Sequence, residues 1–115
     1  MKRLEEVAVI PTGDKAILRE AGDIIRRLLP GAELYLYGSG ARGTRERDSD
    51  LDLLIVTEDR LSRAQETAMA DAVYELELAR GVVISTIHYC RADWDTPLIR
   101  ATPFRHRVDA EAVLV

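Results

Sequence analysis

The sequence contains a single cysteine, Cys90, so it can form no internal disulfide bond and no cysteine-rich metal site. This scarcity fits a reducing compartment. No apolar run approaches the roughly 20 residues that a membrane-spanning helix requires, and the first residues do not resemble a secretory signal. We therefore expect a cytoplasmic protein that does not contact a membrane.

Basic residues are fewer than acidic residues. The chain has 16 lysine and arginine residues against 20 aspartate and glutamate residues, a formal net charge of -4, and this balance argues against non-specific binding to a nucleic-acid backbone. A length of 115 residues predicts one domain, residues 1–115, without room for a separate substrate-binding domain. We expect such a small protein to need a partner, either another protein or a second copy of itself.

Hydrophobic periodicity alternates between helical and extended segments, without repeats. Apolar residues recur at helical spacing from Asp14 to Leu29, with Asp14 as a candidate cap. Ser62 and Gln65 have the spacing of a capping box at the start of a second long helix, which Gly81 ends. The remaining predicted elements are strands at residues 33–37, 51–56 and 82–89, a short last helix that begins at residues 102–103, and an edge segment at residues 113–115. The predicted fold class is α/β (α+β), a small mixed β-sheet flanked by helices.

The segment YGSGARGTRERDSDLDLLIV, residues 37–56, contains the pattern that indicates function. Asp50 and Asp52 are separated by one residue at the start of an apolar strand. Because strand side chains alternate, the two carboxylates should lie on one face, roughly 7 Å apart along the chain. Such a pair suits Mg²⁺ or Mn²⁺, which prefer oxygen ligands and complete their shell with water and substrate phosphates. A bound cation would also offset the repulsion between two neighbouring carboxylates.

Gly38 and Ser39 follow the strand-like ELYLY and precede a segment that can begin a helix. Free backbone N–H groups at such a turn can bind phosphate oxygens, with Gly38 permitting close approach and Ser39 donating its hydroxyl. The alternative is an ordinary strand-to-helix turn in which Ser39 caps the helix. The paired aspartates nearby favour the phosphate site.

Together these residues resemble a known family. The pattern is Gly38-Ser39, ten residues, then Asp50-x-Asp52, with Ala41-Arg42-Gly43 and Ser49 between. It is similar to the minimal nucleotidyltransferases (MNT) of the DNA polymerase beta-like superfamily, and to the MNT antitoxins of HEPN/MNT toxin–antitoxin pairs. The resemblance implies the nucleotidyltransferase fold and an enzyme in which Asp50 and Asp52 are catalytic and bind the metal, while Gly38, Ser39 and Arg42 bind nucleotide phosphates.

The same resemblance implies a substrate and a partner. The nucleoside triphosphate is expected to be ATP, and the product is AMP joined to a protein hydroxyl. In HEPN/MNT pairs the acceptor is a tyrosine of the small helical HEPN-type toxin.

Two departures from the family pattern stand out. Gly40 occupies the place where relatives commonly have a first arginine, although Arg42 remains. The strand expected at residues 82–89 has no carboxylate where active relatives often have a third one, and Ser85 lies near that position. Loss of a general base typically lowers the rate by a factor of about 10² to 10⁴. A tyrosine acceptor, with a reference pKa of about 10, releases its proton more readily than an alcohol and reduces that need.

Three functions follow from the sequence. The first is a nucleotidyltransferase that modifies a protein partner. The second is a catalytically weak or inactive antitoxin that neutralises its partner by binding alone. The third is a degenerate nucleotide-binding domain that acts as a sensor. We favour the first, and we expect Trp94 to pack on the sheet and Arg100, Arg105 and Arg107 to lie on a solvated helix face.

Overall fold

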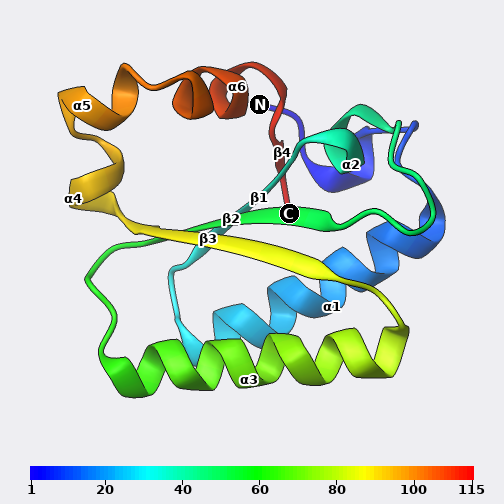
Figure 1. Cartoon of the computed structure of the whole chain (residues 1–115), viewed down its shortest axis with the longest axis horizontal. Helices are drawn as coiled ribbons and strands as arrows, with labels where there is room; N and C mark the ends of the chain where they lie inside the picture. Colours follow the sequence, from blue (N-terminus) through cyan, green and yellow to red (C-terminus); the bar gives the residue numbers. More distant parts are fainter.

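The computed structural model describes residues 1–115 and contains one four-stranded sheet with the strand order β3-β2-β1-β4 (Figure 1). Strand β1 pairs antiparallel with both β2 and β4, whereas β2 and β3 are parallel. The mixed sheet predicted from the sequence is therefore confirmed. The strands span Glu33–Tyr37 (β1), Leu51–Thr57 (β2), Ile84–Cys90 (β3) and Val113–Leu114 (β4).

Two long helices, α1 (Thr12–Leu28) and α3 (Arg63–Arg80), cover one face of the sheet (Figure 1). The main core lies between these helices and the sheet and includes Leu36, Leu53 and Ile55, all fully buried. Leu34 and Leu36 alternate with less buried residues along β1 because successive strand side chains point to opposite faces. Burial of one such side chain typically contributes about 1.5 to 3 kcal/mol to folding.

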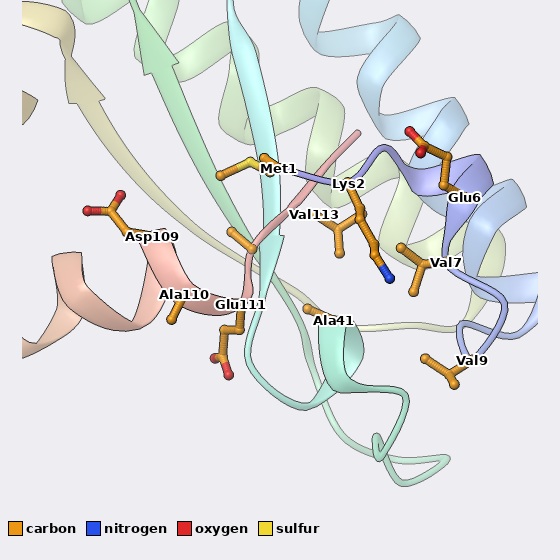
Figure 2. Close-up of a pocket in the computed structure, with 11 residues that line it drawn as sticks. Met1, Lys2, Glu6, Val7, Val9, Ala41, Asp109, Ala110, Glu111 and Val113 are labelled. Atoms are coloured by element: carbon orange, nitrogen blue, oxygen red, sulfur yellow. The ribbon is translucent and has the colours of Figure 1, made fainter.

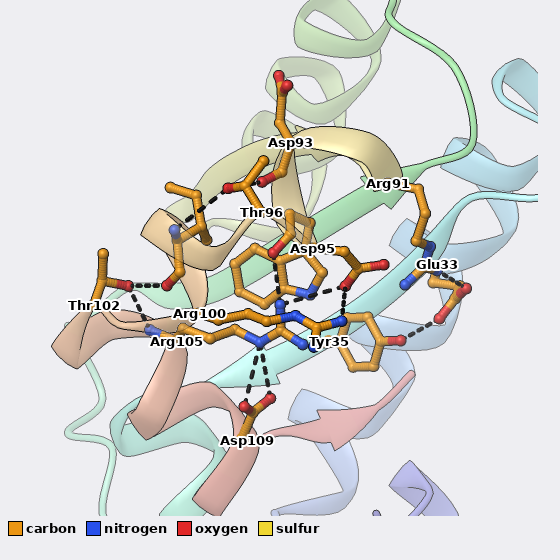
Figure 3. Close-up of polar contacts among 12 residues, drawn as sticks. Glu33, Tyr35, Arg91, Asp93, Asp95, Thr96, Arg100, Thr102, Arg105 and Asp109 are labelled. Carbon is orange, nitrogen blue, oxygen red and sulfur yellow. Dashed lines mark hydrogen bonds and ion pairs between the residues drawn. The ribbon is translucent and has the colours of Figure 1, made fainter.

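The opposite face of the sheet is covered by the short helices α4 (Arg91–Trp94), α5 (Pro97–Arg100) and α6 (Pro103–Glu111). Trp94 packs there with Val108 against the sheet, as the sequence predicted. Arg105 holds the helices together: its guanidinium lies 4.3 Å from the Trp94 ring centroid and donates to the Trp94 carbonyl at 2.7 Å. Arg105 also pairs with Asp109, at 3.1 Å (Figure 3). Arg105 is thus a structural residue of this layer, and the expectation that it lies on a solvated helix face was wrong, because its guanidinium packs on Trp94.

Local signals in the sequence end and begin several elements as expected. Ser62 and Gln65 form the capping box of α3, and Gly81 ends that helix in the left-handed conformation. Thr102 caps α6. The shorter elements are the 3-10 helix η1 (Leu4–Glu6) and helix α2 (Ser39–Arg42). None of the helices is both long enough and apolar enough to span a bilayer.

Several boundaries differ from the prediction by one or two residues, at Thr12, Leu28, Thr57, Ile84, Cys90 and Leu114. The first helix begins at Thr12 after an N-cap at Pro11, so Asp14 is not a cap. The Asp14 carboxylate instead accepts hydrogen bonds from Arg45, 31 residues further along the chain. Asp14 forms this long-range ion pair in place of a local helix cap. Strand β3 begins at Ile84 rather than Val82, because the chain must first leave the left-handed turn at Gly81.

Candidate functional site

The site predicted from the sequence lies at one end of the sheet, on the face that α4, α5 and α6 cover. Tyr37 is the last residue of β1 and pairs with Asp52 of β2. Asp52 in turn pairs with Ser85 of β3. Because paired residues of neighbouring strands point to the same face, Tyr37, Asp52 and Ser85 form a row across three strands.

The turn after β1 lies directly against this row. Gly38 has φ +73°, and a β-carbon added to it would lie 2.8 Å from Oδ2 of Asp52. Any other residue here would push the Asp52 carboxylate aside and would strain the backbone, whose positive φ favours glycine. The absence of a side chain at position 38 therefore lets the turn backbone approach Asp52.

Helix α2 continues from this turn for a single turn. Its backbone hydrogen bonds are donated by Ala41, Arg42, Gly43 and Thr44. The amide N–H groups of Ser39 and Gly40 have no acceptor in the protein. Ser39 is the first residue of α2, and its side chain makes no capping hydrogen bond, so the structure does not support the alternative of Ser39 as a helix cap. These free donors can bind an anion beside Asp52.

The two aspartates differ in their surroundings. Asp52 is half-buried within β2, whereas Asp50 is exposed and immediately precedes the strand. Burial raises the pKa of the Asp52 carboxyl above its ordinary value, and the negative charge of Asp50 raises this pKa further. The two carboxylates thus repel each other in the protein. A divalent cation held between them would remove this repulsion, so the donor set fits Mg²⁺ or Mn²⁺.

Tyr37 extends the polar row and links it to helix α6. Burial raises the pKa of the Tyr37 hydroxyl, the charge of Asp52 raises it further, and the charge of Arg107 lowers it. The Tyr37 ring packs edge-on against Phe104, with 5.2 Å between the ring centroids. Phe104 and Arg107 therefore bring one face of α6 over the site.

Arg42, the expected phosphate-binding arginine, is paired with a residue that the sequence did not indicate. Its Nη1 atom donates to both carboxylate oxygens of Glu111, at 3.0 Å each. The same carboxylate accepts a hydrogen bond of 3.2 Å from the Gly38 N–H. Glu111 is the last residue of α6, so its approach to the turn depends on the tertiary fold and has no local sequence signal.

A second unexpected ion pair positions the segment between α2 and β2. Arg45 donates to Asp14 of α1 at 2.6 and 3.0 Å, and both side chains are only 11% exposed. Arg45 also donates to the Ser49 carbonyl at 2.7 Å. It therefore anchors to α1 the connection that leads into Asp50.

No third carboxylate joins the pair. Ser85 is the direct neighbour of Asp52 on β3, so this position of the strand carries a hydroxyl and no carboxylate. Histidine, cysteine and acidic side chains form no cluster of three or more that could hold a metal ion. The protein therefore supplies two carboxylates here, and other ligands of a cation would come from water or substrate.

Comparison with protein families matches residues 18–109 of this chain to the nucleotidyltransferase domain family. No curated protein matches the sequence.

Several solved structures are similar to the chain. One is the crystal structure of a toxin–antitoxin with AMP-PNP, with 19% sequence identity, a TM-score of 0.56, and coverage of 90% of this chain and 72% of that chain. A mutant of the toxin–antitoxin MntA-HpeT has 17% identity, a TM-score of 0.56, and coverage of 85% and 70%. A structure of the tri-AMPylated Shewanella oneidensis HEPN toxin in complex with MNT antitoxin has 14% identity, a TM-score of 0.53, and coverage of 87% and 69%. At these identities the likeness shows a shared fold.

Proposed function

Since this chain belongs to the nucleotidyltransferase domain family, we propose that it transfers AMP from ATP to a hydroxyl group of a protein partner. Asp50 and Asp52 hold the divalent cation. The N–H groups of the turn at Gly38 and Ser39, together with Arg42, bind the phosphates. This assignment follows the resemblance of the motif.

One observation carries the proposal. The turn backbone approaches the Asp52 carboxylate so closely that a β-carbon at position 38 would lie 2.8 Å from Oδ2. Donors for a phosphate and an acidic ligand for a cation thus lie side by side. A metal-bound polyphosphate is the ligand class that needs both groups at once.

The chemistry is a displacement at the α-phosphorus of ATP. The acceptor oxygen forms a bond to phosphorus, the bond to the bridging oxygen breaks, and pyrophosphate leaves with its electron pair. A bound Mg²⁺ or Mn²⁺ would supply positive charge to neutralise the developing charge on the phosphates. Ser85 is a poor general base, so the acceptor proton leaves to solvent, which suits an acidic hydroxyl such as tyrosine.

The proposed partner is a small helical protein of the HEPN type. The structures similar in fold are toxin–antitoxin complexes, and one of them contains a tri-AMPylated HEPN toxin. The chain's acidic balance, with a formal net charge of -4, suits a protein acceptor better than a nucleic acid.

The test is to incubate the chain with ATP, Mg²⁺ and the protein encoded by the neighbouring gene. We expect the intact mass of that protein to rise by one or more AMP units. The double variant Asp50→Asn, Asp52→Asn should leave the mass unchanged. Glu75→Gln on the outer side of α3 removes a charge far from the motif and serves as the matched control. An unmodified partner in the presence of the wild-type chain would argue against transfer.

The missing third carboxylate favours a second candidate, an antitoxin that neutralises its partner by binding. The same double variant separates the two functions. Under catalysis, the variant loses neutralisation at every molar ratio. Under binding alone, it neutralises the partner stoichiometrically, as the wild type does. A nucleotide sensor would instead bind ATP without modifying or neutralising any partner.

A further inference from the structure

The carboxylate of Glu111 lies on the groups that the proposed function assigns to nucleotide phosphates. It accepts hydrogen bonds from the Gly38 N–H at 3.2 Å and from Arg42 at 3.0 Å to each oxygen. The Gly38 N–H and the Arg42 guanidinium are both hydrogen-bond donors, and the Glu111 carboxylate is their negatively charged acceptor. A carboxylate and a phosphate compete for such donors because both are oxygen anions of similar reach.

We propose that Glu111 is a built-in competitor of the nucleotide, which must displace this side chain before its phosphates reach Gly38 and Arg42. The inference rests on the proposed function, since it concerns the same turn. It adds a means by which the free protein is kept in a state of lower nucleotide affinity.

Glu111 is held in place by the elements on either side of it. Val108 of α6 and Val113 of β4 are both buried, and β4 pairs with β1 next to the turn. The backbone at position 111 is thus anchored at both ends. Its side chain is 23% exposed and Arg42 is 51% exposed, so solvent weakens their ion pair enough for a polyphosphate to replace it.

A place for the displaced side chain exists beside the turn. Glu111 and Ala41 line a pocket of about 630 Å³, into which the Lys2 side chain extends from the N-terminal segment (Figure 2). Lys2 makes no ion pair within the fold. A Glu111 side chain that leaves Arg42 would therefore lie beside a pocket that contains an unpaired cation.

A role as metal ligand does not account for Glu111. Asp50, Asp52 and Glu111 do not form a group of three side chains that could hold one metal ion. A purely structural role remains as the rival explanation, because the ion pair also connects α2 to α6. The two explanations predict opposite changes in nucleotide affinity.

The experiment measures the dissociation constant of a nonhydrolysable ATP analogue with Mn²⁺, by calorimetry, for the wild type and Glu111→Gln. We expect the variant to bind about two- to fivefold more tightly, the range for losing a competing, partly exposed ion pair. Glutamine keeps the shape and an acceptor for Gly38 but lacks the charge. Glu111→Ala tests the same point without any acceptor, and thermal melting verifies that each variant folds.

Glu75→Gln is the matched control, since it is the same substitution at an exposed site on α3, away from the turn and the pocket. Its affinity should equal that of the wild type. If both Glu111 variants fold and bind the analogue equally or more weakly than the wild type, Glu111 is a support and the inference fails alone. If no variant and no wild-type sample binds the analogue, the proposed function fails together with the inference.

Discussion

At the residue scale, Asp52 is the position where function and stability conflict. It lies in a strand whose other residues are all buried and, apart from Thr57, apolar, with the turn of Gly38 against its carboxylate. Burial and the charge of Asp50 both raise the pKa of Asp52. The folded protein therefore binds this proton more tightly than the unfolded chain does. An acidic residue that destabilises the metal-free protein in this way is explained if a bound cation offsets its charge when the protein functions.

We predict that Asp52→Asn stabilises the metal-free protein at neutral pH by a few degrees in melting temperature. Because the folded pKa is raised, the stability associated with the Asp52 proton is lost as pH rises from the ordinary carboxyl pKa through the raised one. The advantage of the variant should accordingly disappear in acid, below about pH 4. Thermal melting across this pH range, in the presence of a chelator, measures both effects. A variant less stable than the wild type at neutral pH would contradict the prediction.

At the element scale, the connection between α2 and β2 is joined to helix α1 by the ion pair of Arg45 with Asp14. Residues between Gly43 and Asp50 form no helix or strand. Arg45 reaches from this connection to Asp14 of α1, where both side chains are 11% exposed, and hydrogen bonding to Asp14 raises the pKa of the guanidinium. The position of Asp50 thus depends on a contact with helix α1, which lies far from Asp50 in the sequence.

We predict that Arg45→Ala lowers the free energy of unfolding by about 3 kcal/mol, because it leaves the Asp14 carboxylate buried without a partner. Urea unfolding measures this loss. The variant should also bind Mn²⁺ more weakly, since the segment leading into Asp50 loses its anchor. Arg47→Ala is the control, as Arg47 is exposed and its side chain makes no ion pair. Equal stability of the two variants would show that the ion pair contributes little.

At the scale of the whole molecule, the two faces of the sheet differ in how they are covered. Helices α1 and α3 cover one face with the larger core, while short helices cover the other face and bring Phe104, Arg107 and Glu111 over the row of Tyr37 and Asp52. The face with the smaller apolar cluster is the one that carries the candidate site. Ligand binding there should therefore tighten the short helices more than the long ones.

We predict that Mn²⁺ together with a nonhydrolysable ATP analogue stabilises the folded protein by about 2.7 kcal/mol when the ligand concentration is 100 times its dissociation constant. Hydrogen exchange should slow in residues 38–42 and in α6, and stay unchanged in the middle of α3. The double variant Asp50→Asn, Asp52→Asn should show neither effect. Equal protection in that variant would mean that the ligand binds elsewhere.

Local chemistry explains which features could be predicted from the sequence. The capping box of Ser62 and Gln65 and the helix end at Gly81 depend on neighbours a few residues away, so the pattern indicated them correctly. Strand β1 follows from alternation of apolar residues, and β2 follows from a continuous apolar run. The register of β3 places Ser85 beside Asp52. Asp14 was predicted wrongly because its true partner, Arg45, lies far along the chain.

By itself the sequence determined the family, the mixed α/β class and the spacing of Gly38, Ser39, Asp50 and Asp52, because motif spacing and periodicity are properties of the chain alone. Only the tertiary structure decided that Glu111 lies on Gly38 and Arg42. The physical reason is that an ion pair between residues far apart in sequence requires the packing of α6 on the sheet. Arg42 and Glu111 are 69 residues apart, so no local spacing or periodicity links them.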